Sequence, residues 1–248
     1  MIPLNKFLRR WFYRMSGSHR PKFNCPICGY EGVFKDKRIS KEPDLVRVHS
    51  KCLGCGSNER HRIMYLVLER LFKNDNKPAG KILHIAPEDC MKPILSRYFE
   101  TYHTADLLMT GVDFKEDIQR MSFSDGSYDC VVVSRVLTIP ENLEACVREL
   151  RRVLKPGGIA IIAEIHSHEK TLEFNRMINF RSREVGIDIL DLYRKHFGQV
   201  DIHLSNQHDS KYQLDNRMML EGSPKDDYPQ LVRIPGVGFM ELVAVCRA

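Results

Sequence analysis

Two pairs of cysteines near the start of the chain have the spacing of a metal site. Cys25 and Cys28 form one C-x-x-C pair, and Cys52 and Cys55 form the other. Each pair places two thiols on a tight turn, and two such turns together supply the four sulfur ligands that Zn²⁺ binds in a tetrahedron. Four protein ligands leave no open coordination position. We therefore expect a structural zinc ion and not a catalytic one.

Other roles for these cysteines fit the spacing less well. A redox pair needs only one C-x-x-C at the start of a helix, and iron–sulfur sites have different spacings. His49 and His61 are close enough in sequence to replace a cysteine as a ligand. With four cysteines present, zinc bound by cysteine alone is the interpretation that the pattern favours.

A second group of candidate residues follows apolar segments in the rest of the chain. In an open parallel sheet, ligands bind beyond the carboxyl ends of the strands, so the residues after each strand are informative. Asp106 lies 22 residues after His84, about where an acid accepts hydrogen bonds from ribose hydroxyls. Asp117 is followed by Ile118, a pair that could take an adenine amino group and cover the ring.

The segment after residues 81–86 is Pro87-Glu88-Asp89, without the G-x-G-x-x-G of dinucleotide sites or a phosphate-binding loop. A ligand with ribose, adenine and a positive charge but no phosphate suits these carboxylates better than a nucleotide does. S-adenosylmethionine has that character.

The elements that must position these residues alternate between strand and helix. A helix over residues 58–73 leads into the first strand at 81, and Ser57 is expected to cap it. Further strands are predicted at 101–106, 128–134, 158–165 and 238–248, and helices at 90–99, 142–154 and 189–197. This order predicts an α/β fold with a doubly wound, mostly parallel sheet.

Several of these segments resemble the class I S-adenosylmethionine-dependent methyltransferases. The resemblance is carried by SFSDGSYDCVVVSRVL at 122–137 and LRRVLKPGGIAIIAE at 150–164. CGSNERHR at 55–62 and LHIAPE at 83–88 resemble a subgroup in which a four-cysteine ribbon leads into the helix before the first strand. The resemblance implies a Rossmann-like methyltransferase fold with a small N-terminal zinc ribbon.

The resemblance also implies cofactor roles for residues that match the family's motifs. His84, Ala86 and Glu88 correspond to the first motif, which contacts the methionine part of the cofactor and is normally rich in glycine. Without those glycines, the Glu88 side chain would have to hold the cofactor's ammonium group. The remaining assignments are Asp106 for ribose, Asp117 and Ile118 for adenine, and Ser134 with Arg135 at the mouth of the site.

Each acid also has a purely structural interpretation, as a turn former or as a favourable charge at a helix N-terminus. Methyl transfer chiefly requires alignment of donor and acceptor, and a base is needed only if the acceptor keeps a proton. His166, just after a predicted strand, is the candidate base, with His168 and His208 as weaker alternatives.

Positive charge is concentrated in the first third of the chain. The chain has a net charge of +6, but residues 1–80 carry 17 Lys and Arg against 7 Asp and Glu. The other residues carry 21 Lys and Arg against 25 Asp and Glu. The first third could therefore contact RNA or another anionic surface, and the Arg60 to Arg62 segment could bind phosphate.

The methyl acceptor is left open between RNA and a small or glycan-like molecule. The alternative to an enzyme is a non-enzymatic zinc-ribbon binding module with a degenerate methyltransferase domain. The expected divisions of the chain are a basic amphipathic segment at 1–22, the zinc ribbon at 23–57 and the methyltransferase domain at 58–248.

A cytoplasmic location fits the composition best. The eight cysteines do not form a disulfide framework, and basic residues interrupt the apolar residues of the N-terminus. No apolar run is long enough to span a bilayer, although residues 1–22 could lie on an anionic membrane surface.

Overall fold

The computed structural model describes residues 20–39, 42–73, 80–166, 169–178, 180–216, 218–220 and 240–248. The amphipathic segment predicted at 1–22 lies almost wholly outside these residues. Within them, no helix is long and apolar enough to cross a membrane.

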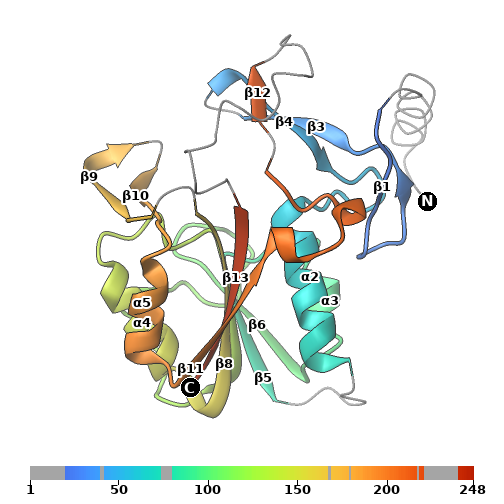
Figure 1. The fold of residues 1–248 in the computed structure, drawn as a ribbon. Coiled ribbons are helices and arrows are strands. Elements are labelled where there is room, and N and C mark those ends of the chain that lie inside the picture. Colours follow the sequence, from blue (N-terminus) through green and yellow to red (C-terminus); the bar gives the residue numbers. More distant parts are fainter. Residues whose placement is uncertain are drawn as a thin grey trace.

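A six-stranded sheet forms the centre of the molecule (Figure 1). Its order is β11-β13-β8-β7-β5-β6. The strands are β5 (Lys81–Ile85), β6 (Thr101–Ala105), β7 (Tyr128–Ser134), β8 (Leu154–His166), β11 (Gln199–Leu204) and β13 (Met240–Arg247). The pairs among β6, β5, β7 and β8 are parallel, whereas β13 is antiparallel to both of its neighbours. The predicted α/β fold with a mostly parallel sheet is confirmed.

Helices cover both faces of this sheet (Figure 1). Helices α2 (Glu59–Phe72) and α3 (Lys92–Leu95) lie on one face, and α4 (Leu143–Arg152) and α5 (Ile189–His196) lie on the other. Strand β7 serves both cores: Val131 and Val133 pack on the α4 side, and Cys130 and Val132 on the α2 side. A strand buried on both faces reads as a continuous apolar run, which is why its sequence was informative.

Three local predictions need correction. The helix predicted at 90–99 shrinks to four residues, with Pro93 near its start, where the missing N–H is tolerated. Asn58, and not Ser57, occupies the N-cap of α2, because the Ser57 hydroxyl lies 3.2 Å from the Cys55 sulfur. Strand β11 was not predicted.

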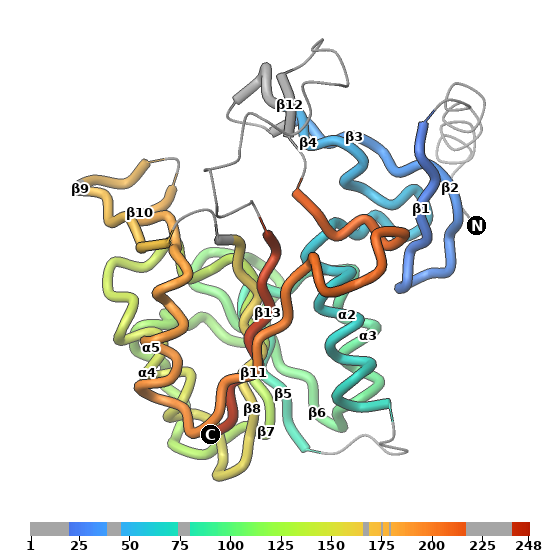
Figure 2. Tube along the Cα trace, viewed as in Figure 1, coloured from blue at the N-terminus to red at the C-terminus, as the bar shows by residue number. Residues whose placement is uncertain are grey.

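The N-terminal region forms two small sheets. One pairs β1 (Phe23–Asn24) with β2 (Glu31–Gly32), and the other has the order β12-β4-β3. The latter contains β3 (Lys35–Ile39), β4 (Glu42–Lys51) and β12 (Met218–Leu220), so a segment from the far end of the chain completes it. Figure 2 shows β3 and β4 above α2. This sheet lies over the carboxyl ends of the parallel strands (Figure 1).

The connection after β8 forms a hairpin that was also not predicted. It consists of β9 (Leu172–Ile178) and β10 (Arg181–Glu184) and lies at the same end of the sheet as β12 (Figure 1). Two short 3₁₀ helices, η1 (Ser205–Gln207) and η2 (Ser210–Tyr212), follow β11.

Candidate functional site

The four cysteines of the N-terminal region meet at one point. Their sulfur atoms all lie within 4.8 Å of one another. The distances from Cys25 to Cys55 and from Cys28 to Cys52 are both 3.7 Å between sulfurs. A tetrahedral zinc site with Zn–S bonds of about 2.3 Å has sulfur atoms about 3.8 Å apart. The sulfur arrangement therefore fits a zinc ion.

The two cysteine turns repeat the same local geometry. Gly29 N donates to Cys25 O, and Gly56 N donates to Cys52 O, both at 2.9 Å. Both glycines have positive φ, +67° and +79°, in the left-handed region that glycine adopts without strain. The sequence thus folds each C-x-x-C-G segment into a turn that aims two sulfurs at a common centre.

Arg62 ties this region to the rest of the molecule. Its guanidinium is fully buried and donates to the carbonyl oxygens of Ser50 and Ser57, each at 2.9 Å. It also donates to Tyr212 O at 2.9 Å and lies 4.6 Å from the centre of the Phe34 ring. One side chain of α2 therefore connects the N-terminal region with the segment after β11.

The predicted cofactor residues follow three strands that end at the same level. Ile85 of β5 is in register with Ala105 of β6 and with Val133 of β7. The residues that come next, including Ala86 and Asp106, consequently share one edge of the sheet. This edge is where the strand order reverses, the usual position of a ligand in an open α/β sheet.

Two residues at this edge adopt a backbone conformation that is unusual without glycine. Ala86 has φ +51° after β5, and Arg135 has φ +59° after β7. Such residues tend to gather at functional sites, where the surrounding structure holds them in place. Ala86 thus keeps the left-handed conformation although the glycine-rich sequence of the first motif is absent.

Glu88 is an ionised carboxylate with one occupied and one unpartnered oxygen. Oε1 accepts hydrogen bonds from Arg60 Nε at 2.7 Å, His61 Nε2 at 3.0 Å and Ser134 Oγ at 3.2 Å. Burial raises the pKa of Glu88, but hydrogen bonding from His61 and the charge of Arg60 outweigh it and lower the pKa to about 2. Oε2 is buried and has no hydrogen-bond partner among the described residues.

His84 faces that unpartnered oxygen from within the sheet. Its Nδ1 is 2.8 Å from the Tyr102 hydroxyl, and its Nε2 lies 3.9 Å from Glu88 Oε2 without a hydrogen bond. Burial lowers the pKa of His84 to about 4, so the imidazole is neutral near pH 7. Glu88 Oε2 and His84 Nε2 are thus two buried polar atoms that lie close together, and neither has a hydrogen-bond partner among the described residues.

The carboxylates of Asp106 and Asp117 both have local partners. Asp106 Oδ1 accepts from the backbone N–H groups of Leu108 and Met109, at 2.7 and 2.6 Å. Asp117 Oδ1 accepts from Gln119 N at 2.9 Å, and Gln119 Nε2 is 3.2 Å from both of its oxygens. The turn-forming role is therefore present at both acids. Asp106 Oδ2 makes no hydrogen bond within the described residues.

The remaining predicted residues are less well connected to this edge. Ile118 is buried in the core on the α4 side of the sheet. His166 is the last residue of β8, but its side chain, like the whole of His168, lies outside the described residues. His208 has its pKa lowered by burial and by the charge of Arg70 in the last turn of α2, whereas Arg60, which binds Glu88, lies in the first turn.

The Arg60 to Arg62 segment faces inward. Arg60 and His61 bind Glu88, and Arg62 binds backbone carbonyls. His61 Nδ1 also accepts from Asn58 N at 3.1 Å, which closes the first turn of α2. The geometry favours the structural role of these side chains over phosphate binding.

Further polar residues at this edge were missed by the sequence reasoning. They are Arg47 of β4, Glu164 near the end of β8, Asn216 and Glu241 of β13. Glu164 and Glu241 are each 1% exposed. The available signal was an acid inside an otherwise apolar strand, in IAIIAEI and in MELVAV.

Residues 52–162 match a family model described as a methyltransferase domain. Curated relatives match short stretches of the chain. A polyketide synthase-nonribosomal peptide synthetase of Aspergillus clavatus is 35% identical over 75 residues, which is 30% of this chain and 2% of the relative. A hybrid synthetase of Xenoacremonium sinensis is 42% identical over 59 residues, 24% of this chain and again 2% of the relative. The chain thus spans a small fraction of these proteins.

Solved structures share the fold at low sequence identity. The 1,6-didemethyltoxoflavin-N1-methyltransferase of Burkholderia thailandensis, bound to S-adenosylhomocysteine, has a TM-score of 0.51 and 15% identity, covering 76% of this chain and 77% of that one. The [4+2]-cyclase SpnF has a TM-score of 0.50 and 14% identity, covering 75% and 79%. The family match indicates a methyltransferase domain within residues 52–162, and the solved structures share its fold.

Proposed function

We propose that this protein transfers a methyl group from S-adenosylmethionine and that Cys25, Cys28, Cys52 and Cys55 hold a structural zinc ion. The observation that carries the methyltransferase proposal is the buried, unpartnered Glu88 Oε2 at the edge where β5, β6 and β7 end level. An ionised carboxylate oxygen that accepts no hydrogen bond suits an ammonium group. Together with the left-handed Ala86, it fits the methionine part of the cofactor.

When bound, the sulfonium of this cofactor supplies an electrophilic methyl group. The chain's own residues bind and orient it. Glu88 Oε2, beside His84, would hold the ammonium group, and Asp106 Oδ2 would accept from the ribose hydroxyls. Asp117 and Ile118 would hold the adenine. Because the reaction is a displacement in line, correct placement of donor and acceptor contributes most of what the protein must supply.

Calorimetric titration with S-adenosylmethionine and S-adenosylhomocysteine tests the cofactor site. The native protein should bind both, and Glu88→Gln should weaken binding by about tenfold or more, because a neutral amide replaces a buried charge. Glu144→Gln is the matched control, since Glu144 is exposed on α4 and pairs with Lys195. Absence of binding by the folded native protein would overturn the proposal.

The zinc proposal rests on the sulfur distances and on the repeated turns. Metal binding to such a site is coupled to folding, because the four thiolates come together only in the folded chain. Elemental analysis of the purified protein should give one zinc per chain, and Cys52→Ser should lose it and melt at a lower temperature. Iron in place of zinc, with visible absorbance, would contradict the assignment.

One observation favours a second candidate, a binding module that has lost the cofactor. Glu88 Oε1 is already held by Arg60 and His61, and the glycines of the first motif are absent. A shared fold does not fix the reaction, since SpnF is a cyclase with the same fold. If the native protein binds zinc but neither cofactor form, the binding module becomes the better description.

A further inference from the structure

A buried cluster of charged and polar side chains lies next to the proposed cofactor edge. We call it the polar cluster and define it as Arg47, Glu59, Arg135, Glu164, Asn216 and Glu241. Glu241 and Glu164 come from adjoining strands, in which Leu242 is in register with Glu164, so the Glu164 side chain leaves the sheet on the α4 side and the Glu241 side chain on the α2 side. Arg135 follows β7, and its N–H donates to Ala163 O at 2.9 Å. These three residues therefore share the carboxyl end of the sheet.

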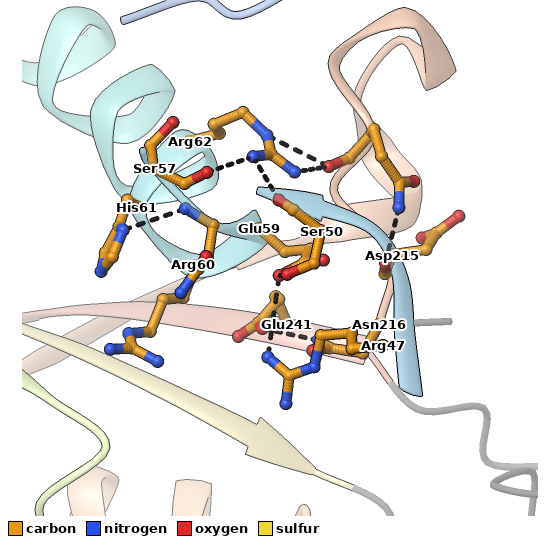
Figure 3. A network of polar contacts seen from close by, with 12 residues as sticks. Arg47, Ser50, Ser57, Glu59, Arg60, His61, Arg62, Asp215, Asn216 and Glu241 are labelled. Carbon is orange, nitrogen blue, oxygen red and sulfur yellow. Dashed lines mark hydrogen bonds and ion pairs between the residues drawn. The ribbon is translucent and has the colours of Figure 1, made fainter. Parts of the chain in front are cut away.

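Strand β4, the start of α2 and the segment before β12 provide the opposite side of the polar cluster. Arg47 lies in β4, and its Nη1 is 3.7 Å from the Glu59 carboxylate at the start of α2. Asn216, shortly before β12, donates from Nδ2 to Glu241 Oε1 at 2.5 Å, and Arg135 forms an ion pair with the same carboxylate. Figure 3 shows Arg47, Asn216 and Glu241 gathered beneath β4.

Most of the unsatisfied buried atoms of the described residues gather here. Among the described residues, eleven buried side-chain nitrogen and oxygen atoms on residues other than His49 have no hydrogen-bond partner. Eight of them belong to the polar cluster or to the adjoining cofactor edge, namely Arg47 Nε, Glu59 Oε1, His84 Nε2, Glu88 Oε2, Arg135 Nε, Glu164 Oε2, Asn216 Oδ1 and Glu241 Oε2. Folded proteins leave few buried polar groups unpaired, so a concentration of them points to a bound molecule.

We propose that the polar cluster binds the methyl acceptor, and that this acceptor is a small molecule rich in hydroxyl or amino groups. The inference rests on the proposed methyltransferase function and names the substrate class for it. Within the polar cluster, three unpartnered acceptor atoms, on Glu59, Asn216 and Glu241, stand against two donors, on Arg47 and Arg135. A fourth unpartnered oxygen, on Glu164, comes from the other face of the sheet. The ligand must therefore donate more hydrogen bonds than it accepts.

This balance disfavours RNA as the acceptor. Phosphate groups only accept hydrogen bonds, and they are bound by clusters of unpaired lysine and arginine. In the polar cluster, both arginines are already paired with carboxylates, Arg47 with Glu59 and Arg135 with Glu241. Sugar-like polyols and amino sugars, in contrast, offer several donors on a small frame.

The polar cluster is placed to hold an acceptor close to the cofactor. Arg135 directly follows Ser134, whose hydroxyl donates to Glu88. Arg60, which binds Glu88, also interacts electrostatically with Glu241. Burial raises the pKa of Glu164 to about 7, so this carboxyl can either donate to or accept from a hydroxyl group near neutral pH. Glu88 thus faces the cofactor, and Glu241 faces the acceptor.

Saturation-transfer NMR on the full chain, with S-adenosylhomocysteine bound, tests the proposal. The probe is a mixture of glucose, galactose, glucosamine, galactosamine and myo-inositol. We expect transfer from the native protein to at least one of them. Glu241→Gln and Arg47→Met should weaken its affinity by about tenfold or more, whereas Glu144→Gln should not change it. Calorimetry with S-adenosylhomocysteine verifies that each variant is folded, because neither substitution touches Glu88.

The outcomes separate this inference from the proposed function. If S-adenosylhomocysteine binds but no probe receives saturation, or if native and variant proteins give equal signals, the acceptor class is wrong and the cofactor site stands. If tritiated methyl groups enter total RNA in a ribonuclease-sensitive form, the acceptor is RNA and the inference is overturned. If S-adenosylhomocysteine itself does not bind, the proposed function fails first.

Discussion

The two ends of the central sheet differ in how their charged and polar side chains are partnered. At the amino end, Asp129 accepts from Lys81 N at 2.7 Å and from Lys155 Nζ at 2.8 Å. Nearby, Arg152 donates to Met121 O at 2.9 Å and to the Glu149 carboxylate at 2.7 Å. Charges at this end are paired with each other and with the backbone.

At the carboxyl end, comparable groups are buried and left without partners. Glu88 Oε2, His84 Nε2 and Glu241 Oε2 make no hydrogen bond within the described residues. Each such atom costs about 1–3 kcal/mol relative to a paired one. Such groups are paired at the amino end of the sheet. We infer that they stay unpaired at the carboxyl end, despite this cost, because a ligand binds there.

The largest expected difference between the two ends is in pH dependence. Because the pKa of His84 is about 4 in the folded protein and near 6.5 when unfolded, only the unfolded chain binds this proton between those values. The free energy of unfolding should therefore fall as pH drops from 6.5 to 4, by up to about 3 kcal/mol. The groups that face His84 are Glu88, His61 and Tyr102, and Glu88 opposes the shift only partly.

Urea denaturation of native protein and His84→Asn at pH 7, 6 and 5 measures this effect. The native protein should lose stability relative to the variant as pH falls. Asp129→Asn is the control from the amino end. The pKa of Asp129 lies below 3.8, so its contribution is lost only in stronger acid, and this variant should follow the native slope. Identical slopes for native protein and His84→Asn would show that His84 is not buried as a neutral group.

The sequence was most informative where function depends on local spacing. Cys25 and Cys28 need only one tight turn between them, and the same turn recurs at Cys52. The strand ends were also predictable, because β5 and β7 are buried on both faces and read as apolar runs. Asp106 and Glu88 could be placed at one edge from the order of elements alone.

Contacts between distant segments could not be predicted in this way. CGSNERHR and LHIAPE were both visible as motifs, but nothing in either shows that Arg60 and His61 bind Glu88. Likewise, Arg47 lies 194 positions before Glu241, and the three residues of β12 that pair with β4 carry no distinctive pattern. The polar cluster depends on such pairings, which local propensity does not encode.

A smaller effect should separate two aspartates at opposite ends of the sheet. Asp106→Asn should weaken S-adenosylmethionine binding by about tenfold, near 1.4 kcal/mol. The turn should be kept, because the amide oxygen of the new side chain can still accept from the N–H groups of Leu108 and Met109. Asp129→Asn should lower the free energy of unfolding by about 1 kcal/mol and leave the affinity unchanged. Calorimetry and urea denaturation of both variants provide the comparison. A loss of stability without a loss of affinity in Asp106→Asn would leave Asp106 as a turn former only.

The smallest expected effect concerns the left-handed residues Gly80 and Ala86, which flank β5. Gly80 has φ +72°, and a Cβ there would overlap the Asp129 carboxylate. Gly80→Ala should therefore lower the free energy of unfolding by about 1 kcal/mol or more. Ala86 adopts φ +51° with a Cβ in place, so Ala86→Gly should raise the free energy of unfolding by up to about 1 kcal/mol.

The melting temperatures of these two variants show whether the backbone is unstrained at Gly80 and strained at Ala86. Glycine already removes the strain at the amino end of β5, whereas alanine preserves it at the carboxyl end, where backbone strain is associated with binding. If Ala86 is held for the cofactor, Ala86→Gly should gain stability while binding S-adenosylhomocysteine no more tightly, because the added backbone freedom must be lost on binding. Loss of stability in Ala86→Gly would mean that the Ala86 methyl group packs usefully and that the two ends of β5 do not differ in strain.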